Sequence, residues 1–373
     1  MTLADGRSYN QRMTIFHGAR RHEAAAQFGG SPDDFLDFSA NINPLPFPCS
    51  LAAALTAALP SIRHYPDSSY RALTAALAGW LQVPADALAL GNGTAELIYT
   101  LLRVLAPAQV VTIEPTFTEY AQAARLAGIP VQALALHPDN GFTLDPAQLT
   151  PLLMPNAMVF LGHPVNPTGI LYPPPVITAL RACCAAHRAT LVLDEAFIDF
   201  TAAPAAASLA AAAAGDERLI VLRALTKFFA IPGLRVGALV ATPAVAAQLR
   251  AQLPPWNVNC LAEAAILHLL ADREWQQASW HAAGAARAPF VSALAALPAL
   301  AAVYPPAANF VLARLRPAFG DSGRLYDYLG RRQLLIRSCR DFPGLDGSFF
   351  RAAIRSPQDN QALLTALTEY PPI

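Results

Sequence analysis

The chain has 373 residues, a length that indicates two domains, and its 26 Lys or Arg and 26 Asp or Glu give a formal net charge of zero. This balance argues against binding to nucleic acid or to an anionic membrane surface, and no run of about 18 strongly apolar residues occurs that could span a bilayer. The 5 cysteines and 8 histidines show no CxxC, HxxxH or HExxH spacing, which argues against a disulfide framework and predicts that no metal is bound.

The N-terminal segment, residues 1–16, is polar and lacks the apolar core of a secretory signal, which predicts a cytoplasmic protein. The first 45 residues are rich in turns that contain Gly and Pro. Because β-type runs begin only later in the chain, we expect these residues to join a smaller domain.

Residues 86–242 alternate short β-type runs with helix-length segments. Several runs are almost entirely apolar, as is typical of strands buried on both faces of a parallel sheet. The predicted strands are Ala87–Leu90, Gln109–Glu114, Val131–Leu136, Met158–Gly162, Thr190–Asp194, Leu219–Arg223 and Val236–Ala241. The predicted helices between them include Glu96–Leu105, Glu119–Ala127 and Val176–His187. This α/β pattern predicts a mostly parallel seven-stranded sheet sandwiched by helices, with a ligand site outside the carboxyl ends of the strands.

The pattern changes after Pro254 and predicts a smaller α+β domain. Its expected segments are two long helices, Leu261–Ala271 and Trp275–Leu300, and shorter runs at Phe310–Ala313 and Leu334–Ile336. The expected division is a large domain over residues 46–258 and a small domain from residues 1–45 and 259–373.

The sequence GNGTAE, which contains Gly93 and Thr94, follows the first predicted strand and opens a helix. Its glycines let backbone amides turn toward an anion, and Thr94 can add a hydroxyl at the helix N-terminus. The sequence lacks the ending of a P-loop and the third glycine of the dinucleotide fingerprint. The alternative is an ordinary strand-to-helix turn in which Thr94 caps the helix.

Two further turns follow predicted strands. Phe117, in the sequence EPTF, could stack on a flat heteroaromatic ring, or it could simply pack in the core. Asn166, in HPVNPTG, is restricted to an extended conformation by Pro167, which presents its amide to the strand-end cleft. Turns also use Asn, Pro and Gly for structural reasons alone.

Asp194 stands where the apolar run Leu191–Leu193 ends. A carboxylate buried there needs a cationic or donor partner, and a protonated pyridine nitrogen is one such partner. The stretch that follows, Thr201–Ala214, consists mostly of small residues broken by a proline, which indicates an alanine-rich loop or a weak helix.

Lys227 lies in apolar surroundings in the sequence LTKFFAIPGLR. Desolvation disfavours the ammonium form, so such a lysine can become a nucleophile toward carbonyl compounds, pyridoxal phosphate (PLP) among them. Arg235, which follows a Pro-Gly turn, is suited to binding a phosphate. Taken alone, a single lysine is more often a solvated surface residue.

The order and spacing of GNGTAE, EPTF, HPVNPTG, LDEAF and LTKFFAIPGLR resemble the fold-type I PLP-dependent enzymes, in the histidinol-phosphate aminotransferase branch. The resemblance implies that PLP is the cofactor and that Lys227 joins its aldehyde and later shuttles protons. Asp194 would pair with the pyridinium nitrogen, Asn166 would donate to the phenolic oxygen, and Phe117 would stack on the ring.

The same resemblance implies that Gly93, Thr94, Thr226 and Arg235 hold the cofactor phosphate. Tyr65, in the sequence RHYPD, is similar to a tyrosine that reaches the phosphate of the neighbouring subunit, which implies a homodimer with shared active sites. Without the other motifs, a surface-loop aromatic would be the simpler interpretation of Tyr65.

Two residues depart from the pattern of the branch. Phe197 stands where many relatives have a tyrosine that bonds the phenolic oxygen, so Asn166 is the remaining side-chain donor. Ala224 replaces a frequent Ser or Thr, which removes one hydroxyl from the expected phosphate site. Both departures bear on cofactor affinity.

Two segments resemble the threonine-phosphate decarboxylases of cobalamin biosynthesis within this branch: HG followed by LDFSANINP near the N-terminus, and TKFFAIPGLR. The resemblance implies decarboxylation of a small phosphorylated amino acid, L-threonine O-3-phosphate, to (R)-1-aminopropan-2-yl phosphate. Asn43, Arg337 and Arg351 would bind the substrate, with Arg351 on its carboxylate and Arg337 on its phosphate. Either arginine could instead be an ordinary ion-pair partner at the surface. The sequence His17-Gly18-Ala19 departs from the usual His-Gly-Gly.

Two alternatives stay open at this point. Within the branch, an aminotransferase acting on histidinol phosphate or a related amino acid would use the same cofactor, and the two reactions differ in which Cα bond stands perpendicular to the conjugated plane. A PLP-binding regulatory module without turnover belongs to a different class. It is disfavoured because the chain carries no basic extension of the size of a helix-turn-helix domain.

Overall fold

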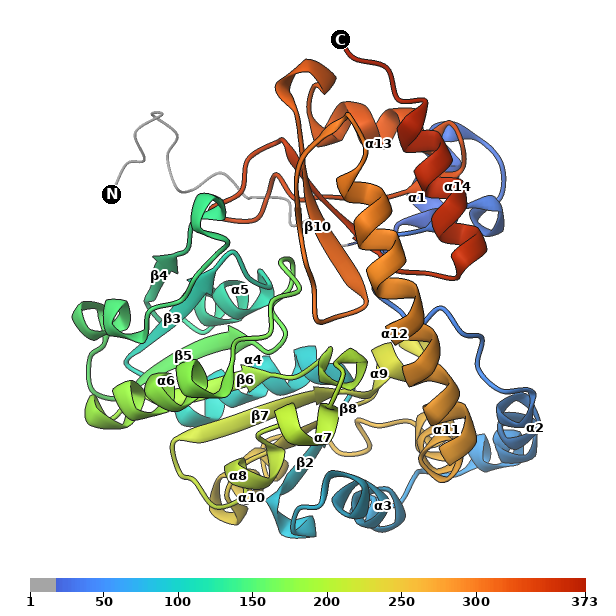
Figure 1. Cartoon of the computed structure of the whole chain (residues 1–373). Helices are drawn as coiled ribbons and strands as arrows, with labels where there is room; N and C mark the ends of the chain where they lie inside the picture. Colours follow the sequence, from blue (N-terminus) through green and yellow to red (C-terminus); the bar gives the residue numbers. More distant parts are fainter. Residues whose placement is uncertain (1–17) are drawn as a thin grey trace.

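The computed structural model describes residues 18–373, and residues 1–17, with His17 of the HG sequence, lie outside the described part. Three sheets organise residues 18–373: a seven-stranded sheet in the lower body of Figure 1, a four-stranded sheet in its upper part, and a two-stranded ladder. Within residues 18–373, no helix is long and apolar enough to cross a bilayer.

The strand order of the large sheet is β2-β8-β7-β6-β5-β3-β4. Its strands are β2 (Leu88–Gly91), β3 (Gln109–Glu114), β4 (Val131–Ala135), β5 (Ala157–Gly162), β6 (Thr190–Asp194), β7 (Leu219–Ala224) and β8 (Gly237–Val240). Strand β8 is antiparallel to both neighbours, and the other pairs are parallel. The expected mostly parallel sheet of seven strands is therefore confirmed.

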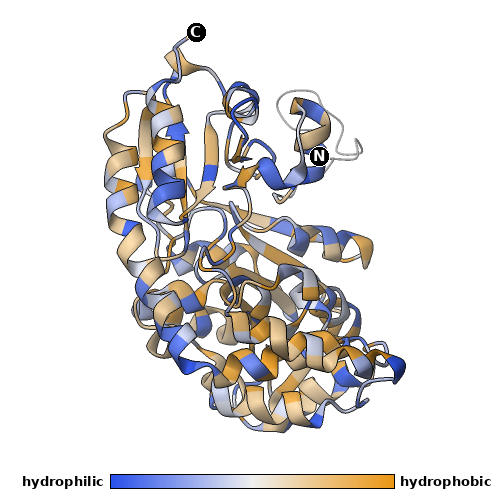
Figure 2. Ribbon diagram, turned by 90° about the vertical axis from the view of Figure 1, so that its right-hand side faces the viewer, coloured by the Kyte–Doolittle hydropathy of each residue, from blue (hydrophilic) through white to orange (hydrophobic). Residues whose placement is uncertain are grey.

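Helices cover both faces of this sheet because apolar side chains point to both sides of each strand. The main covering helices are α3 (Arg71–Leu81), α4 (Gly93–Leu105), α5 (Glu119–Leu126), α6 (Pro174–Ala186), α10 (Pro243–Arg250) and α11 (Cys260–Ala271). Val110 and Val192 pack with α4, α5 and α10 on one face, whereas Val111 and Leu193 pack with α3, α6 and α11 on the other. Figure 2 shows hydrophobic residues along the strands inside this body.

The upper part is an antiparallel sheet of order β12-β13-β10-β9 covered by helices. Its elements are β9 (Leu300–Tyr304), β10 (Phe310–Leu315), β12 (Arg337–Ser338), β13 (Phe349–Ala353), α12 (Arg273–Ala295), α13 (Ser322–Gly330) and α14 (Pro357–Thr368). Phe290 of α12, Leu325 of α13 and Leu363 of α14 pack with Val311 and Phe350 of the strands in one buried cluster.

The N-terminal segment is attached to this upper part. Strand β1 (Leu36–Asp37) pairs in parallel with β11 (Leu334–Leu335), and helix α1 (Arg21–Phe28) lies nearby. The backbone N–H of Ala353 donates to the carbonyl of Phe38 at 2.8 Å, which ties the segment to β13. Segments far apart in the sequence thus form one unit in space.

The C-terminal part differs from expectation in several elements, and α13, α14 and β13 were not predicted. The helix expected to continue to Leu300 ends at Ala295, and a turn that contains Pro298 separates it from β9, which begins at Leu300. Strand β9, LAAVY, was not expected because its alanines give no strand signal. The alanine-rich stretch Thr201–Ala214 contains two single-turn helices, α7 (Pro204–Ala207) and α8 (Ala210–Ala213).

Candidate active site

The loops that follow β5, β6 and β7 meet at one edge of the large sheet. Gly162 at the end of β5 pairs with Asp194 at the end of β6, and Asp194 pairs with Leu222 of β7. This register places the loop of Asn166, the carboxylate of Asp194 and the turn of Lys227 side by side, because parallel strands end at the same edge.

Lys227 lies in a single-turn helix, α9 (Leu225–Phe228), directly after β7. Its side chain is half-buried, and burial lowers the pKa of Lys227 to about 8; the charges of Arg235 and Arg351 act in the same direction, whereas Asp194 opposes them. A substantial fraction of this amine is neutral at neutral to mildly alkaline pH, which is the form that attacks a carbonyl carbon.

Asp194 is buried and accepts two hydrogen bonds, from the hydroxyl of Tyr120 at 2.7 Å and from the backbone N–H of Ala196 at 3.0 Å. Burial raises the pKa of Asp194, and these two bonds and the charge of Lys227 oppose that rise. A carboxylate has lone pairs for about four hydrogen bonds, so Asp194 can still accept one from a protonated ring nitrogen.

Tyr120 is a site residue that the sequence analysis missed. It lies in the first turn of α5, where its ring stacks on Phe160 with centroids 4.8 Å apart and meets Phe117 edge-on at 5.6 Å. The signal was present as a second aromatic residue three positions after Phe117. Phe117 itself is half-buried beside it.

The start of α4 and the turn of Arg235 form a cradle. Gly93 has a φ of 80°, and a Cβ at this position would stand 2.6 Å from a guanidinium nitrogen of Arg235. A Cβ on Gly237 would likewise stand 2.8 Å from the backbone nitrogen of Thr94. Only glycine fits these two positions, and the N-terminus of a 13-residue helix beside an exposed guanidinium suits a phosphate. Thr226 is buried in the first residues of α9.

Arg351 reaches this edge from β13. One of its guanidinium nitrogens donates to the side-chain oxygen of Asn166 and the other to the carbonyl of Ser39 at 2.7 Å, whereas its Nε finds no partner among residues 18–373. Burial lowers the pKa of Arg351 to about 10, and the charge of Arg337 acts in the same direction. A buried guanidinium whose partners are neutral is suited to an incoming anion.

Arg337 lies directly opposite Arg351 on the neighbouring strand β12. Unlike Arg351, it is paired with a carboxylate: its two terminal nitrogens lie 2.8 and 2.7 Å from the two oxygens of Asp341. The ring of Phe342 lies 5.0 Å from its guanidinium carbon. The structure thus brings both predicted substrate arginines together but leaves only one of them without an acidic partner.

Two predicted residues lie in other settings. Tyr65 is 79% exposed and stacks on Trp256 with ring centroids 4.3 Å apart, so it is on the surface of its own chain. Asn43 is buried under the Lys227 turn, where its amide donates to the carbonyl of Phe228 at 2.8 Å and its oxygen accepts from the N–H of Leu45 at 3.0 Å. The amide of Asn43 therefore supports the backbone that carries Lys227.

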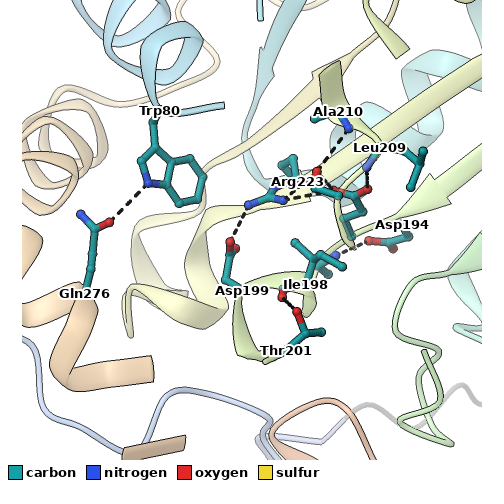
Figure 3. A network of polar contacts seen from close by, with 12 residues as sticks. Trp80, Asp194, Ile198, Asp199, Thr201, Leu209, Ala210, Arg223 and Gln276 are labelled. Atoms are coloured by element: carbon teal, nitrogen blue, oxygen red, sulfur yellow. Dashed lines mark hydrogen bonds and ion pairs between the residues drawn. The ribbon is translucent and has the colours of Figure 1, made fainter. Parts of the chain in front are cut away.

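A buried ion network next to the site was also missed (Figure 3). Arg223 lies 3.1 Å from Glu195 and 2.6 Å from Asp199, and the Glu195 carboxylate also accepts the hydroxyl of Ser208 and the N–H of Leu209, each at 2.6 Å. Because Glu195 follows Asp194 and Arg223 precedes Lys227 by four positions, the network ties the ends of β6 and β7 together. Charged residues inside the apolar runs were its signal in the sequence.

The two departures noted in the sequence occupy apolar settings. Phe197 is 6% exposed and meets Phe310 edge-on with centroids 4.8 Å apart. Ala224 is 5% exposed at the end of β7, directly before α9. Neither position supplies a hydroxyl to this edge of the sheet.

The side chains at this edge match the chemical groups of PLP. A half-buried amine of lowered pKa suits an aldehyde, a buried carboxylate with free lone pairs suits a pyridinium nitrogen, and a glycine-lined helix N-terminus beside Arg235 suits a phosphate. The residues present therefore fit this cofactor.

Comparison with known proteins agrees with this geometry. The chain is 43% identical to the threonine-phosphate decarboxylase of Salmonella typhimurium over 94% of this chain and 95% of that protein. It superposes on the crystal structure of histidinol-phosphate aminotransferase from Clostridium acetobutylicum with a TM-score of 0.82 and 32% identity, covering 89% of this chain and 98% of the other. It superposes on the L-threonine-O-3-phosphate decarboxylase of Porphyromonas gingivalis with a TM-score of 0.77 and 27% identity, covering 88% and 97%.

The family model for aminotransferase class I and II matches residues 33–367, which span all three sheets described above. The match therefore includes the Lys227 turn and the strand that carries Arg351. This chain belongs to the aminotransferase class I and II family.

Proposed function

We propose that this chain is a PLP-dependent carboxy-lyase that converts L-threonine O-3-phosphate to (R)-1-aminopropan-2-yl phosphate, a step of cobalamin biosynthesis. The observation that carries the proposal is the pair of buried guanidinium groups, Arg337 and Arg351, opposite each other on β12 and β13, with Arg351 in contact with Asn166 at the sheet edge. Two neighbouring cations suit a substrate that bears two anionic groups. The 43% identity to a threonine-phosphate decarboxylase supports the same substrate.

The residues at the sheet edge would hold PLP in the following way. Asp194 would keep the ring nitrogen protonated, Asn166 would donate to the phenolic oxygen, and Phe117 would lie against the ring. The phosphate would rest on the residues of the cradle, namely Gly93, Thr94, Thr226 and Arg235. When bound, PLP supplies an electron sink that weakens a bond to the substrate Cα.

The other residues act on the substrate itself. Arg351 would bind its carboxylate and Arg337 its phosphate, which orients the molecule between β12, β13 and the Lys227 turn. The amine of Lys227 would hold and deliver a proton, because Cα must gain one proton after carbon dioxide leaves. The lowered pKa of Lys227 suits proton transfer near neutral pH.

Purified protein with PLP and L-threonine O-3-phosphate should release carbon dioxide and form one aminopropanol phosphate per substrate consumed. The second candidate is a histidinol-phosphate aminotransferase, favoured by the TM-score of 0.82 to such an enzyme. Absence of carbon dioxide together with efficient transamination of histidinol phosphate to an oxo-acid acceptor would replace the first proposal by the second. A single-turnover experiment with each substrate separates the two.

A homodimer with shared active sites is part of this proposal. Tyr65 is 79% exposed and held against Trp256, so its hydroxyl is available to a second copy of the chain rather than to its own site. We likewise propose the division into a large domain over residues 46–258 and a small domain from residues 1–45 and 259–373. Light scattering on the holoprotein tests the dimer, and mixing a Tyr65→Phe chain with a Lys227→Ala chain tests whether sites are shared.

A further inference from the structure

The two arginines expected to bind the substrate are not equivalent. Arg337 and Arg351 are directly opposite on β12 and β13, which places their side chains on one face of the sheet. Like charges in that position repel each other, so each arginine needs compensation. Arg351 has the neutral partners Asn166 and Ser39, whereas Arg337 has the carboxylate of Asp341.

The contact between Arg337 and Asp341 occupies one edge of the guanidinium group, and one nitrogen of that edge also donates to the carbonyl of Ser338. Both terminal nitrogens of Arg337 donate, one to each carboxylate oxygen, at 2.8 and 2.7 Å. A phosphate bound end-on to the two terminal nitrogens would need the same edge of the guanidinium. Asp341 therefore occupies the position that the proposed function assigns to the substrate phosphate.

The surroundings hold this pair in place. The side chains of Arg337 and Asp341 are 8% and 13% exposed. The N–H of Phe342 donates to the carbonyl of Cys339 at 3.0 Å, which closes the turn that carries Asp341, and the Phe342 ring lies against the guanidinium. The Asp341 carboxylate competes with a substrate anion for Arg337 at a high effective concentration, because Asp341 is only four residues from Arg337 in the same chain.

We propose that Asp341 is a specificity-determining residue, whose carboxylate admits a phosphate dianion to Arg337 and excludes carboxylate substrates. A substrate carboxylate offers Arg337 the same charge and the same two oxygens as Asp341, so no binding free energy is gained when it replaces Asp341. A phosphate offers a charge close to −2 at neutral pH and a third oxygen, so it can displace Asp341 or share the fork with it. Phosphorylated amino acids are thereby selected over the dicarboxylic amino acids.

This inference rests on the proposed function, since it assigns Arg337 to the substrate phosphate. Asp341 opposes the binding of every anion to Arg337, which increases selectivity and lowers affinity. In a site without Asp341, Arg337 and Arg351 would together accept aspartate or glutamate, whose two carboxylates match two guanidinium groups.

The test compares the holoenzyme with its Asp341→Asn variant, which keeps the shape of the side chain and removes its charge. Asp359→Asn is the matched control: Asp359 forms an i,i+4 pair with Arg355 at 3.0 Å in the same part of the molecule. Calorimetry measures the binding of L-threonine O-3-phosphate, and steady-state assays measure KM, kcat and competitive inhibition by L-aspartate. Thermal melts establish that each variant is folded.

In Asp341→Asn we expect the dissociation constant and KM for threonine phosphate to fall by about tenfold, with little change in kcat. We expect L-aspartate to inhibit the natural enzyme weakly and the Asp341→Asn variant strongly, and Asp359→Asn should change neither the affinity for threonine phosphate nor this inhibition. If Asp341→Asn does not fold, Asp341→Ala is expected to shift both quantities in the same direction.

An unchanged or weaker affinity for threonine phosphate in a folded variant, or unchanged inhibition by L-aspartate, overturns the inference. A higher KM would mean that Asp341 orients Arg337 for the substrate. Failure of the proposed function is a separate outcome, since it appears as absence of carbon dioxide release by the natural enzyme. Calorimetry with threonine phosphate still reports on Asp341 in that case.

Discussion

The hydroxyl of Tyr120 donates a 2.7 Å hydrogen bond to Asp194, and both side chains are buried beneath the strand-end site. The bond comes from the first turn of α5 and stabilises the ionised carboxylate, since a hydrogen bond to the charged form lowers its pKa. The bond therefore opposes the rise in the pKa of Asp194 that burial causes.

Removal of this hydroxyl should shift the acid limb of the pH profile. In Tyr120→Phe we expect the pKa of Asp194 to rise further above its usual range. A larger fraction of Asp194 is then protonated at any given pH, so kcat should fall first at low pH. A hydrogen bond to a charged group contributes about 1.5–3 kcal/mol, so we expect roughly a tenfold loss or more. The measurement is kcat against pH.

Tyr172→Phe serves as the control for that experiment. Tyr172 is also buried, and its hydroxyl donates to the carbonyl of Phe142 at 2.8 Å, away from Asp194. The Tyr172→Phe substitution should lower the free energy of unfolding and leave the dependence of kcat on pH unchanged. Equal profiles for both variants would contradict the role given to Tyr120.

The pKa of about 8 at Lys227 predicts how the apoprotein captures PLP. Only the neutral amine reacts with the aldehyde, so the capture rate should rise with pH, with a midpoint near 8, and level off above it. Stopped-flow absorbance of bound PLP follows this rate. Lys227→Ala should show no such absorbance change, and a midpoint near the ordinary lysine value would contradict the effect of burial.

The sign of the stability effect follows from the same pKa. Lys227 has a folded pKa below its unfolded value of about 10.5, so the unfolded chain binds more protons between pH 8 and 10.5. The contribution of this residue to the stability of the apoprotein therefore rises with pH through that window. Urea unfolding of the natural chain and of Lys227→Met at pH 8 and 10 measures the difference.

Loss of Arg223 should destabilise the fold strongly. In Arg223→Met the carboxylates of Glu195 and Asp199 stay buried without their cation, which typically costs about 3–5 kcal/mol of unfolding free energy. Arg181→Met is the comparison, because the Arg181–Asp216 pair is about one-third exposed and such pairs contribute about 0–1 kcal/mol. Similar losses in both variants would argue against a special role of the buried network.

A methyl group at Gly93 should weaken PLP binding. In Gly93→Ala the added Cβ would lie 2.6 Å from a terminal nitrogen of the Arg235 guanidinium, so this side chain would have to move. The φ of 80° at this position also disfavours alanine. We expect at least a tenfold higher dissociation constant, about 1.4 kcal/mol, in titrations of the apoprotein with PLP. Gly79→Ala, where a Cβ meets nothing within 4 Å, should leave PLP affinity unchanged.

The strand-end rule explains why much of the site could be predicted from the sequence. Asn166, Asp194 and Lys227 each follow an apolar run, and parallel strands bring such positions to one edge. Tyr120 could not be placed in the same way, because its contact with Asp194 depends on the tilt of α5 against the sheet. The sequence gives the face of a helix but not that tilt.

The C-terminal part was harder to predict for a different reason. Arg337 lies on strand β12 and Asp341 in the turn that follows it, so the periodicity of helices does not relate the two residues. Strand β9 contains two alanines, Ala301 and Ala302, and lies at the edge of its sheet, so its pairing with β10 rather than its composition makes it a strand.

The two-stranded ladder of β1 and β11 has a consequence for synthesis of the chain. Leu36 and Asp37 leave the ribosome long before their partners Leu334 and Leu335 have been translated, so this ladder closes only near the end of translation. The same N-terminal stretch carries the Ser39 carbonyl to Arg351. A nascent chain can therefore bury the large sheet early, but Arg351 meets the Ser39 carbonyl only once nearly every residue has been added.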